Sequence, residues 1–376
     1  MLNETLKYLQ SAVNIAEQYA LDTKAWQKRN KNNCVYLYGA GYLLPYYLRY
    51  LSVFGIQVTA ILDTFKEGVY QNIPIIKYDS FLCTIQDIKR YRIFLSTAAA
   101  SKEIIPKLEQ HLLKENIFFV DFKFLLGTED MNLSEYRKYI VANWNKITDL
   151  YKALSDEKSK RTLLNILRGH VSGNPNWFLD TLDPDLDYPK GVINFSEGEV
   201  LIEPGANDGS TFKEFTRRCP QYVAAYLFEP EPCFRETLLR IATKEKIKGK
   251  KVRIIPKGAW DSKTKLNFYS TAERTGSFIK DCGKGNLLSI ETTTVDIEVQ
   301  GPFSFMKMDI EGAEMNALRG AEKHILQYRP KLGVSVYHKS TDLLDVWNYL
   351  SSLVPDYHFY LRNHTPLWDD IILYAI

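Results

Sequence analysis

Long apolar runs are missing from this sequence, and cysteine is scarce. No stretch approaches the roughly 20 apolar residues that span a bilayer. The opening residues, MLNETLKYLQSAV, lack the basic region and apolar stretch of a secretory signal. The 5 cysteines include no CxxC pair, which fits reduced thiols better than disulfides or a zinc site: Cys34, Cys83, Cys219, Cys233 and Cys282. These absences predict a cytoplasmic protein without a membrane span.

An excess of one charge is also missing. The 48 basic and 45 acidic residues are scattered along the chain and give a formal net charge of +3, so no surface for a polyanion is indicated. Nucleic acid is therefore not expected as a partner. The 376 residues, 45% of them hydrophobic, predict a globular protein of two domains.

The first half alternates β-rich and helical segments. The apolar run Cys34 to Tyr38 is followed by Gly39-Ala-Gly41 and an amphipathic stretch from Tyr42 to Phe54, which indicates a strand, a tight turn and a helix. Further strands are expected at 58–62, 92–96 and 117–120. We expect residues 1–130 to form a small Rossmann-like α/β domain, and the charged, helical residues 131–190 to connect it to the second half.

The second half, residues 191–376, repeats this alternation with stronger strands, which predicts a doubly wound α/β fold. The last two strands have only a short turn region between them, containing Pro366, so we expect an antiparallel pair at the end of an otherwise parallel sheet. The strands are expected at 200–202, 226–228, 252–255, 303–308, 332–337, 357–361 and 371–374.

The loop after the first of these strands, in VLIEPGANDGSTF, is built on Gly205 and Gly209. It does not fit the G-x-G-x-x-G fingerprint of dinucleotide sites, because Asn207 and Ser210 stand at the second and third glycine positions. Two carboxylates in this loop, those of Glu203 and Asp208, would repel a diphosphate but favour a cationic ligand. S-adenosylmethionine carries an ammonium and a sulfonium, and Glu203 suits its amino-acid end.

Glu229 ends the next strand, where a carboxylate can accept hydrogen bonds from both ribose hydroxyls while Pro230 stiffens the turn behind it. The alternative is that Glu229 only caps the following helix. The pairing with Glu203 favours the ligand role.

These residues belong to a series of motifs that resembles the FkbM-type S-adenosylmethionine-dependent methyltransferases. The motifs follow the strand pattern in order, from about Gly173 to the C-terminus: Glu203-x-Gly-Ala-Asn-Asp-Gly209, Phe228-Glu-Pro230, Gly258-Ala-Trp-Asp261, Met306-Lys-Met-Asp-Ile-Glu-Gly-Ala-Glu314, Leu318-Arg-Gly-Ala-Glu322 and Arg329-Pro330. The family usually opens the first motif with Asp, so Glu203 departs from it. Pro204 departs further, because it removes an amide at the turn.

The resemblance implies a class I methyltransferase fold that binds S-adenosylmethionine and methylates hydroxyls of sugars or natural-product scaffolds. Trp260 would stack on the adenine, with core packing of its indole as the alternative. The cofactor residues implied are Glu203, Gly205, Asn207, Asp208, Gly209, Ser210, Glu229, Pro230, Ala259, Trp260 and Asp309.

A hydroxyl acceptor needs a base beside the methyl group. Asp309 follows the strand 303–308 at the mouth of the expected pocket, with a helix N-cap as its alternative role. His338 follows the strand 332–337 and is the preferred base, since an unperturbed imidazole accepts a proton at neutral pH; the alternative is a hydrogen-bonded surface residue. A divalent cation could in principle take oxygen ligands from Asp309, Glu311 and Glu203. Nothing in the spacing of these residues requires a cation, so we expect no metal.

Other charged residues surround these two. Lys339, Arg362 and His364 lie in neighbouring loops and would orient a sugar or acidic acceptor, or else remain solvated. Lys307 is expected to face away from the neighbours of Asp309 and to support the site from behind.

The turn Gly39-Ala-Gly41 with Asp63 is a partial nucleotide-binding pattern. Leu44 stands at the place of the third glycine, which argues against a bound dinucleotide. We interpret the first half as an accessory domain. It would recognise the acceptor, for example a nucleotide-linked sugar, or mediate assembly into a homo-oligomer. A purely structural role stays open.

The sequence thus predicts a cytoplasmic S-adenosylmethionine-dependent O-methyltransferase of a sugar, nucleotide-sugar or glycan precursor. Two rival functions stay open. One is an NAD-dependent sugar oxidoreductase or epimerase that uses Gly39-Ala-Gly41, although no Tyr-x-x-x-Lys pairing supports it. The other is a non-catalytic binding protein with the same fold.

Overall fold

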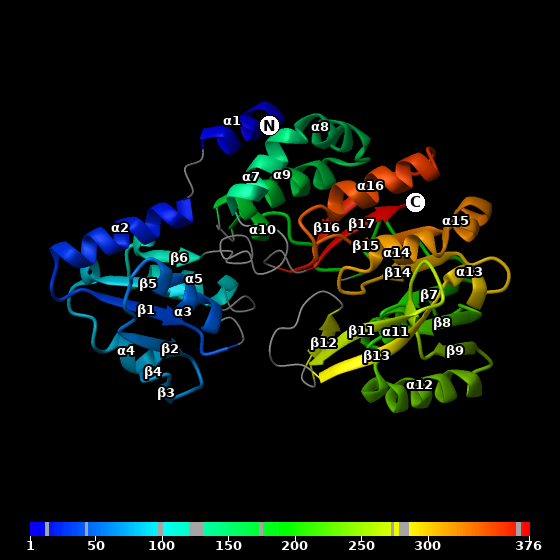
Figure 1. Ribbon diagram of the computed structural model, residues 1–376, viewed down its shortest axis with the longest axis horizontal. Helices are drawn as coiled ribbons and strands as arrows, with labels where there is room; N and C mark the ends of the chain where they lie inside the picture. The colour runs from blue at the N-terminus through cyan, green and yellow to red at the C-terminus, as the bar shows by residue number, and fades with distance from the viewer. Residues whose placement is uncertain are drawn as a thin grey trace. The chain divides into compact units, whose positions relative to one another are not determined.

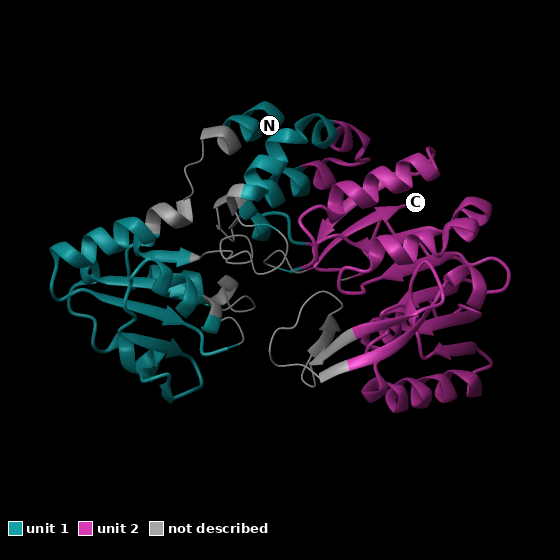
Figure 2. Ribbon diagram, in the orientation of Figure 1, with its two compact units in different colours: residues 1–148, 161–182, 365–368 teal, residues 149–160, 183–364, 369–376 magenta. Residues whose placement is uncertain are grey.

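The chain forms two compact units in the computed structural model, which describes residues 1–11, 15–41, 44–96, 101–119, 131, 133–172, 176–185, 187–271, 274–277, 286–365 and 370–376 (Figure 2). The first unit consists of residues 1–148, 161–182 and 365–368, and the second of residues 149–160, 183–364 and 369–376. The residues expected to connect two domains, 131–190, are divided between the units.

The first unit contains a six-stranded sheet with the order β3-β4-β2-β1-β5-β6 (Figure 1). All neighbours in it are parallel except β3 and β4, a hairpin at one edge that the sequence pattern did not predict. The strands are β1 (Cys34–Tyr38), β2 (Ala60–Asp63), β3 (Gly68–Tyr70), β4 (Ile73–Lys77), β5 (Tyr91–Leu95) and β6 (Ile117–Phe119). The expected strands are confirmed, except that Val120 lies outside the described residues.

Apolar side chains on both faces of this sheet explain why helices cover it twice. Val35 and Leu37 pack into one cluster with Tyr47 of a helix, whereas Tyr36 and Tyr38 pack into another on the opposite face. The helices and 3-10 turns of this sheet domain are α2 (Ile15–Arg29), α3 (Leu44–Val53), α4 (Tyr78–Leu82), α5 (Ser101–Glu109), η1 (Ile88–Arg90) and η2 (Lys114–Asn116).

Helices also form the segment between the two sheets, as the charged pattern predicted. They are α7 (Leu133–Ala142), α8 (Trp144–Ala153), α9 (Glu157–Ser172) and α10 (Asn176–Leu179), and α1 (Leu2–Ser11) contacts α7. None of the helices in the described part of the chain combines the length and the apolar composition that crossing a membrane requires. Four cysteines are free thiols, while Cys282 lies outside the described residues: Cys34, Cys83, Cys219 and Cys233.

The second unit contains a seven-stranded sheet with the order β16-β17-β15-β14-β7-β8-β9 (Figure 1). The last strand, β17, runs antiparallel to both β15 and β16, whereas the other neighbours are parallel. The predicted antiparallel pair is therefore confirmed, although β17 lies inside the sheet. The strands are β7 (Val200–Pro204), β8 (Ala224–Phe228), β9 (Lys251–Ile255), β14 (Phe305–Met308), β15 (Lys331–Ser335), β16 (Phe359–Asn363) and β17 (Ile371–Ala375).

Both faces of this sheet are buried, which is why its central strands are almost continuously apolar. Leu201 of β7 and Phe305 of β14 pack on one face with Phe212 and Phe215, and Ile202 and Met306, next along their strands, are equally buried. The covering helices and the one 3-10 turn in this described region are α11 (Ser210–Arg218), η3 (Pro232–Phe234), α12 (Arg235–Ile247), α13 (Val295–Glu298), α14 (Glu314–Arg319), α15 (Glu322–Tyr328) and α16 (Asp342–Leu353).

A smaller four-stranded sheet, not predicted from the sequence, has the order β10-β13-β11-β12. Its strands are β10 (Gly258–Ala259), β11 (Lys265–Thr271), β12 (Arg274–Ser277) and β13 (Asn286–Thr293). In the seven-stranded sheet, the chain turns to one side after β7 and to the other at β14. The carboxyl ends of these two adjacent strands therefore border the crevice where ligands of doubly wound folds bind.

Candidate active site

A pocket of about 260 Å³ lies at the carboxyl ends of β7, β8 and β14 in the second unit. Most of the residues predicted to bind the cofactor line it, together with Lys307, Glu311 and Tyr337. The predicted residues in its lining are Glu203, Gly205, Asn207, Ser210, Glu229, Pro230, Ala259 and Asp309. Strand ends that are far apart in sequence thus converge on one cavity.

Three other predicted cofactor residues, Asp208, Gly209 and Trp260, are not among the lining residues. Asp208 is exposed, and its carboxylate accepts a hydrogen bond from the Ser210 N–H at 2.9 Å. Gly209 has a φ of +77°, and a Cβ at this position would lie only 2.6 Å from Ile241 Cδ1. These contacts shape the turn into α11, while the part of the 258–260 motif that lines the pocket is Gly258 and Ala259.

Glu203 is a buried carboxylate that lines the pocket. Its side chain is almost wholly inaccessible, and neither oxygen has a hydrogen-bond partner among the residues that the structure describes. Burial raises the pKa of Glu203 to about 8, although the nearby Lys307 ammonium acts in the opposite direction. A buried carboxylate without a hydrogen-bond donor favours the binding of a cationic ligand that can supply one.

Glu229 lines the same pocket and connects two of its loops. One of its oxygens accepts the Asn207 N–H at 2.8 Å, and the other accepts the Glu231 N–H at 2.8 Å. Burial raises the pKa of Glu229 to about 7, against the effect of these two donors. Each oxygen retains acceptor capacity toward a ligand, since a carboxylate accepts about four hydrogen bonds.

Asp309 lies directly after β14 and is not a helix cap. Helix α14 begins only at Glu314, with Ala313 at the N-cap position. The Asp309 carboxylate accepts weak hydrogen bonds from the Tyr337 hydroxyl at 3.2 and 3.3 Å, and its Oδ2 lies 3.8 Å from the Lys307 ammonium. Asp309 therefore does not act as a helix N-cap, and it lines the pocket.

His338 is surrounded by carboxylates, which corrects the expectation of an unperturbed imidazole. Its Nδ1 lies 3.0 Å from Glu314 Oε1, and its Nε2 lies 3.4 Å from Asp309 Oδ1 and 3.5 Å from Glu311 Oε2. Burial alone would lower the pKa of His338, but the three carboxylates, Glu314 first, outweigh it and raise the pKa to about 10. At neutral pH the ring is an imidazolium, which has no lone pair to accept a proton.

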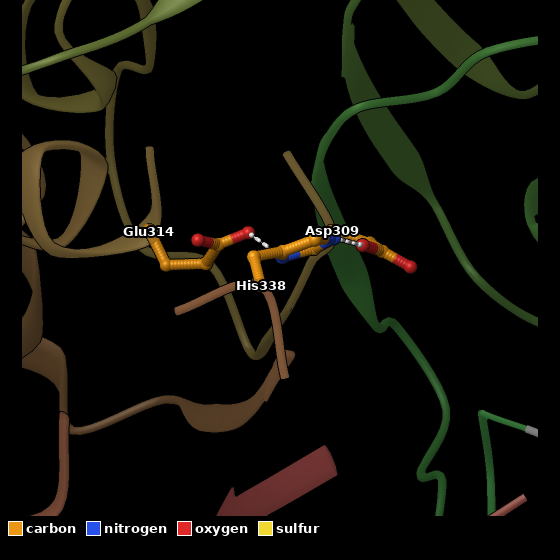
Figure 3. A group of neighbouring side chains, drawn as sticks. All are labelled: Asp309, Glu314 and His338. Carbon is orange, nitrogen blue, oxygen red and sulfur yellow. Dashed lines mark ion pairs between the residues drawn. The ribbon is translucent and has the colours of Figure 1, made fainter. Parts of the chain in front are cut away.

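Asp309, Glu314 and His338 are close enough together to be compared with a metal site. Figure 3 shows, however, that the imidazole ring lies between the two carboxylates, with a different ring nitrogen toward each. A cation bound on the Nε2 side would therefore leave Glu314 on the far side of the ring. The arrangement is that of an imidazolium between carboxylates.

Lys307 faces the pocket, which corrects the expectation that it supports the site from behind. It lines the pocket with a buried side chain, and its ammonium lies 3.1 Å from Asp187 Oδ1. Residues two apart in a strand lie on the same face, so Lys307 and Asp309 share a face, and strand alternation should have indicated this. Asp187 belongs to the loop before β7 and carried no sequence signal.

The charged residues predicted to orient an acceptor have partners within the chain. Arg362 is buried and pairs with Asp156 at 2.5 Å. His364 Nε2 lies 3.0 Å from the Tyr374 hydroxyl, and burial lowers the pKa of His364 to about 4. Lys339 donates from its ammonium to the Gly312 carbonyl. Each of these three side chains is therefore held by a partner within the chain.

The Gly39-Ala-Gly41 turn of the first unit is closed by Asp63. One carboxylate oxygen accepts the Ala40 N–H at 2.8 Å, and the other accepts two N–H groups, from Phe65 at 2.8 Å and Lys66 at 2.9 Å. Leu44 is buried in the core of this unit. Asp63 therefore has an internal role that accounts for its position without a ribose.

Part of the sequence of the second unit matches a known family. Residues 203–359 match the family model of the methyltransferase FkbM domain. This part of the chain carries an FkbM methyltransferase domain. The resemblance seen in the sequence motifs is thereby confirmed, over a shorter range than expected. A search of the curated proteins gives no match.

Solved structures show the fold of the FkbM domain and its neighbouring unit. The methyltransferase FkbM from Methylobacillus flagellatus is 22% identical, with a TM-score of 0.77 over 100% of this chain and 98% of that chain. This confirms the predicted α/β fold of the class I methyltransferase type. Fibrillarin from Aeropyrum pernix, in complex with natively bound S-adenosyl-L-methionine, is 13% identical over 50% of this chain and 71% of its own, with a TM-score of 0.32.

Proposed function

We propose that this protein transfers a methyl group from S-adenosylmethionine to a hydroxyl of a sugar or glycan precursor. The observation that carries the proposal is Glu203, a buried carboxylate without a hydrogen-bond partner among the described residues, which lines the pocket of an FkbM domain. The ammonium of the cofactor would supply the donors that Glu203 lacks. Glu229 would accept hydrogen bonds from the ribose, and the backbone of Gly258 and Ala259 would lie along the base.

The bound cofactor supplies an activated methyl carbon, and the chain's own residues must align the acceptor and remove its proton. His338 is already protonated at neutral pH, so it is a poor acceptor for that proton. Asp309 remains as the carboxylate at the pocket, beside the Tyr337 hydroxyl. We assign the base role to Asp309, and to His338 the role of a cation that orients it.

The acceptor class rests on the resemblance and on the polar groups around Asp309. Incubation with S-adenosylmethionine labelled in the methyl group and a panel of neutral glycosides, uronic acids and nucleotide sugars tests it. We expect label in a hydroxyl-bearing acceptor, and incorporation at least about 100-fold slower with Asp309→Asn. Label that enters an amine, or that enters the acceptors equally with the variant, would contradict the assignment.

The oxidoreductase alternative has less support, because the carboxylate of Asp63 is occupied by backbone N–H groups. Cytoplasmic location, acceptor recognition by the first unit and homo-oligomer assembly remain part of the proposal. Light scattering tests the homo-oligomer assembly, and fractionation of the native source tests the cytoplasmic location.

A further inference from the structure

Glu314 is a buried carboxylate behind the pocket, at the first residue of α14. Its relative exposure is 0%, and it does not line the cavity. Its Oε1 accepts the Ile310 N–H at 2.9 Å and the Gly312 N–H at 3.4 Å, and also lies 3.0 Å from His338 Nδ1. One oxygen thus connects the loop after β14 with the loop after β15.

The loop that Glu314 holds needs such support. Glu311 and Gly312 have φ angles of +55° and +93°, and for Glu311 this left-handed conformation costs about 1 kcal/mol or more. The Lys339 ammonium donates to the Gly312 carbonyl from the other side. Asp309 stands directly before this turn, so the direction of its carboxylate depends on the turn.

The second group that Glu314 holds is the His338 ring. The ring lies between Glu314 and Asp309, as Figure 3 shows, and Glu311 also faces its Nε2. A ring fixed by a carboxylate on one nitrogen presents the other nitrogen in one direction. Contact with Glu314 therefore sets where His338 meets Asp309.

We propose that Glu314 is a positioning residue for methyl transfer, which fixes the His338 ring and the 310–312 turn together so that Asp309 faces the pocket. The inference rests on the proposed function, in which Asp309 takes the acceptor's proton. It goes beyond that function because Glu314 does not line the cavity and acts through other residues.

The charges around the ring agree with this role. Glu314, Asp309 and Glu311 together raise the pKa of His338 to about 10, with Glu314 contributing most among them. Asp342 of α16 and the neighbouring Lys339 are the further charged groups close to the pair. The His338 cation in turn keeps the pKa of Glu314 below its usual range, despite the burial that would raise it.

Glu314→Gln tests the inference, because the amide keeps an oxygen for the two backbone N–H groups and removes the charge. Glu322→Gln is the matched control: Glu322 lies in α15 and accepts a hydrogen bond from the Tyr349 hydroxyl at 2.6 Å. The ring-proton NMR signal of His338, assigned with His338→Gln, is followed from pH 5 to 10. Methyl transfer and the affinity for S-adenosylmethionine are measured on the same proteins.

We expect the midpoint for His338 to fall by at least one pH unit in Glu314→Gln, and kcat to fall tenfold or more. KM for the cofactor should stay within threefold, and Glu322→Gln should behave as the wild type. An unchanged midpoint or an unchanged kcat in Glu314→Gln overturns the inference. If this variant does not fold, Glu314→Asp decides, because the shorter side chain keeps the charge but withdraws its oxygen from the His338 ring and the 310–312 turn. A fall in kcat of tenfold or more in Glu314→Asp supports the inference, and an unchanged kcat refutes it. Calorimetry with the cofactor reports separately on the proposed function.

Discussion

Gly205 and Asp309 touch through their backbones, although they come from loops after different strands. A Cβ at Gly205 would overlap with the Asp309 carbonyl oxygen and would lie 2.9 Å from Ile310 Cγ2. The φ of Gly205 is +83°, a conformation that glycine adopts readily and other residues rarely adopt. The proposed cofactor loop and the proposed catalytic loop are therefore packed directly against each other.

Gly205→Ala should weaken cofactor binding at least tenfold and lower the free energy of unfolding by about 2 kcal/mol or more, since the new methyl group must displace the Asp309 backbone. Calorimetry and chemical denaturation measure the two effects. Gly191→Ala is the control, because Gly191 has a φ of +77° but open space where its Cβ would be. It should lose only about 1–2 kcal/mol, with unchanged cofactor affinity. Equal effects of the two substitutions on affinity would show that the close approach is unimportant.

Glu203→Gln should stabilise the protein without cofactor at pH 8 and weaken cofactor binding. The folded protein holds the proton of Glu203 until about pH 8, whereas the unfolded chain loses it near pH 4.5. The free energy of unfolding of the wild type therefore falls between these pH values, at up to about 1.4 kcal/mol per pH unit, and the variant lacks this fall.

Thermal unfolding at pH 5 and pH 8 measures the difference, which should be small at pH 5 and several degrees at pH 8. The exposed Glu236, paired with Arg240 on the surface of α12, provides the control Glu236→Gln. This control should show no pH-dependent difference. If the stability of Glu203→Gln relative to wild type fell between pH 5 and pH 8, Glu203 could not be a buried carboxylate without a hydrogen-bond partner.

Binding of S-adenosylmethionine should release a proton between pH 6 and pH 8. Glu203 is largely protonated in the free protein, and a cationic ligand favours its ionised form. Affinity should consequently rise up to about pH 8, where the α-amino group of the ligand begins to lose its own proton. Calorimetry in two buffers with different ionisation enthalpies counts the protons. Proton uptake on binding would be inconsistent with a cation beside Glu203.

Asp309→Asn should lower kcat by about 10²–10⁴-fold, the usual contribution of a positioned base, with the dissociation constant of the cofactor changed by less than threefold. Asp356→Asn, at an exposed carboxylate paired with Arg329, is the control and should retain wild-type rates. Steady-state rates with the acceptor found in the panel give the answer. Full activity of Asp309→Asn would remove Asp309 from the mechanism and favour a base elsewhere.

Local patterns predicted much of the fold because each depends on neighbouring residues. Apolar runs gave the strands of both large sheets except β3 and β4. Three residues at the carboxyl ends of these strands line the pocket: Glu203, Glu229 and Asp309. The carboxyl ends of adjacent parallel strands must meet, so these positions follow from strand order. The hairpin of β3 and β4 and the four-stranded sheet have weaker patterns and were missed.

Tertiary contacts account for the rest of the candidate site. The sequence could not show that Glu314 contacts His338 and changes its protonation, because the two lie on different elements. Asp187 reaches Lys307 from a loop without regular structure, where no periodicity indicates a direction. Arg362 is similar, since its burial against Asp156 depends on how a distant helix packs.

The most direct test of the central claim is a calorimetric titration of the wild-type protein at pH 7.5 with S-adenosylmethionine, S-adenosylhomocysteine and NADH. We predict saturable binding of the first two at one site per chain, at least tenfold weaker binding of S-adenosylmethionine to Glu203→Gln, and no binding of NADH. Tight binding of NADH, with no heat from either adenosyl compound, would contradict the account.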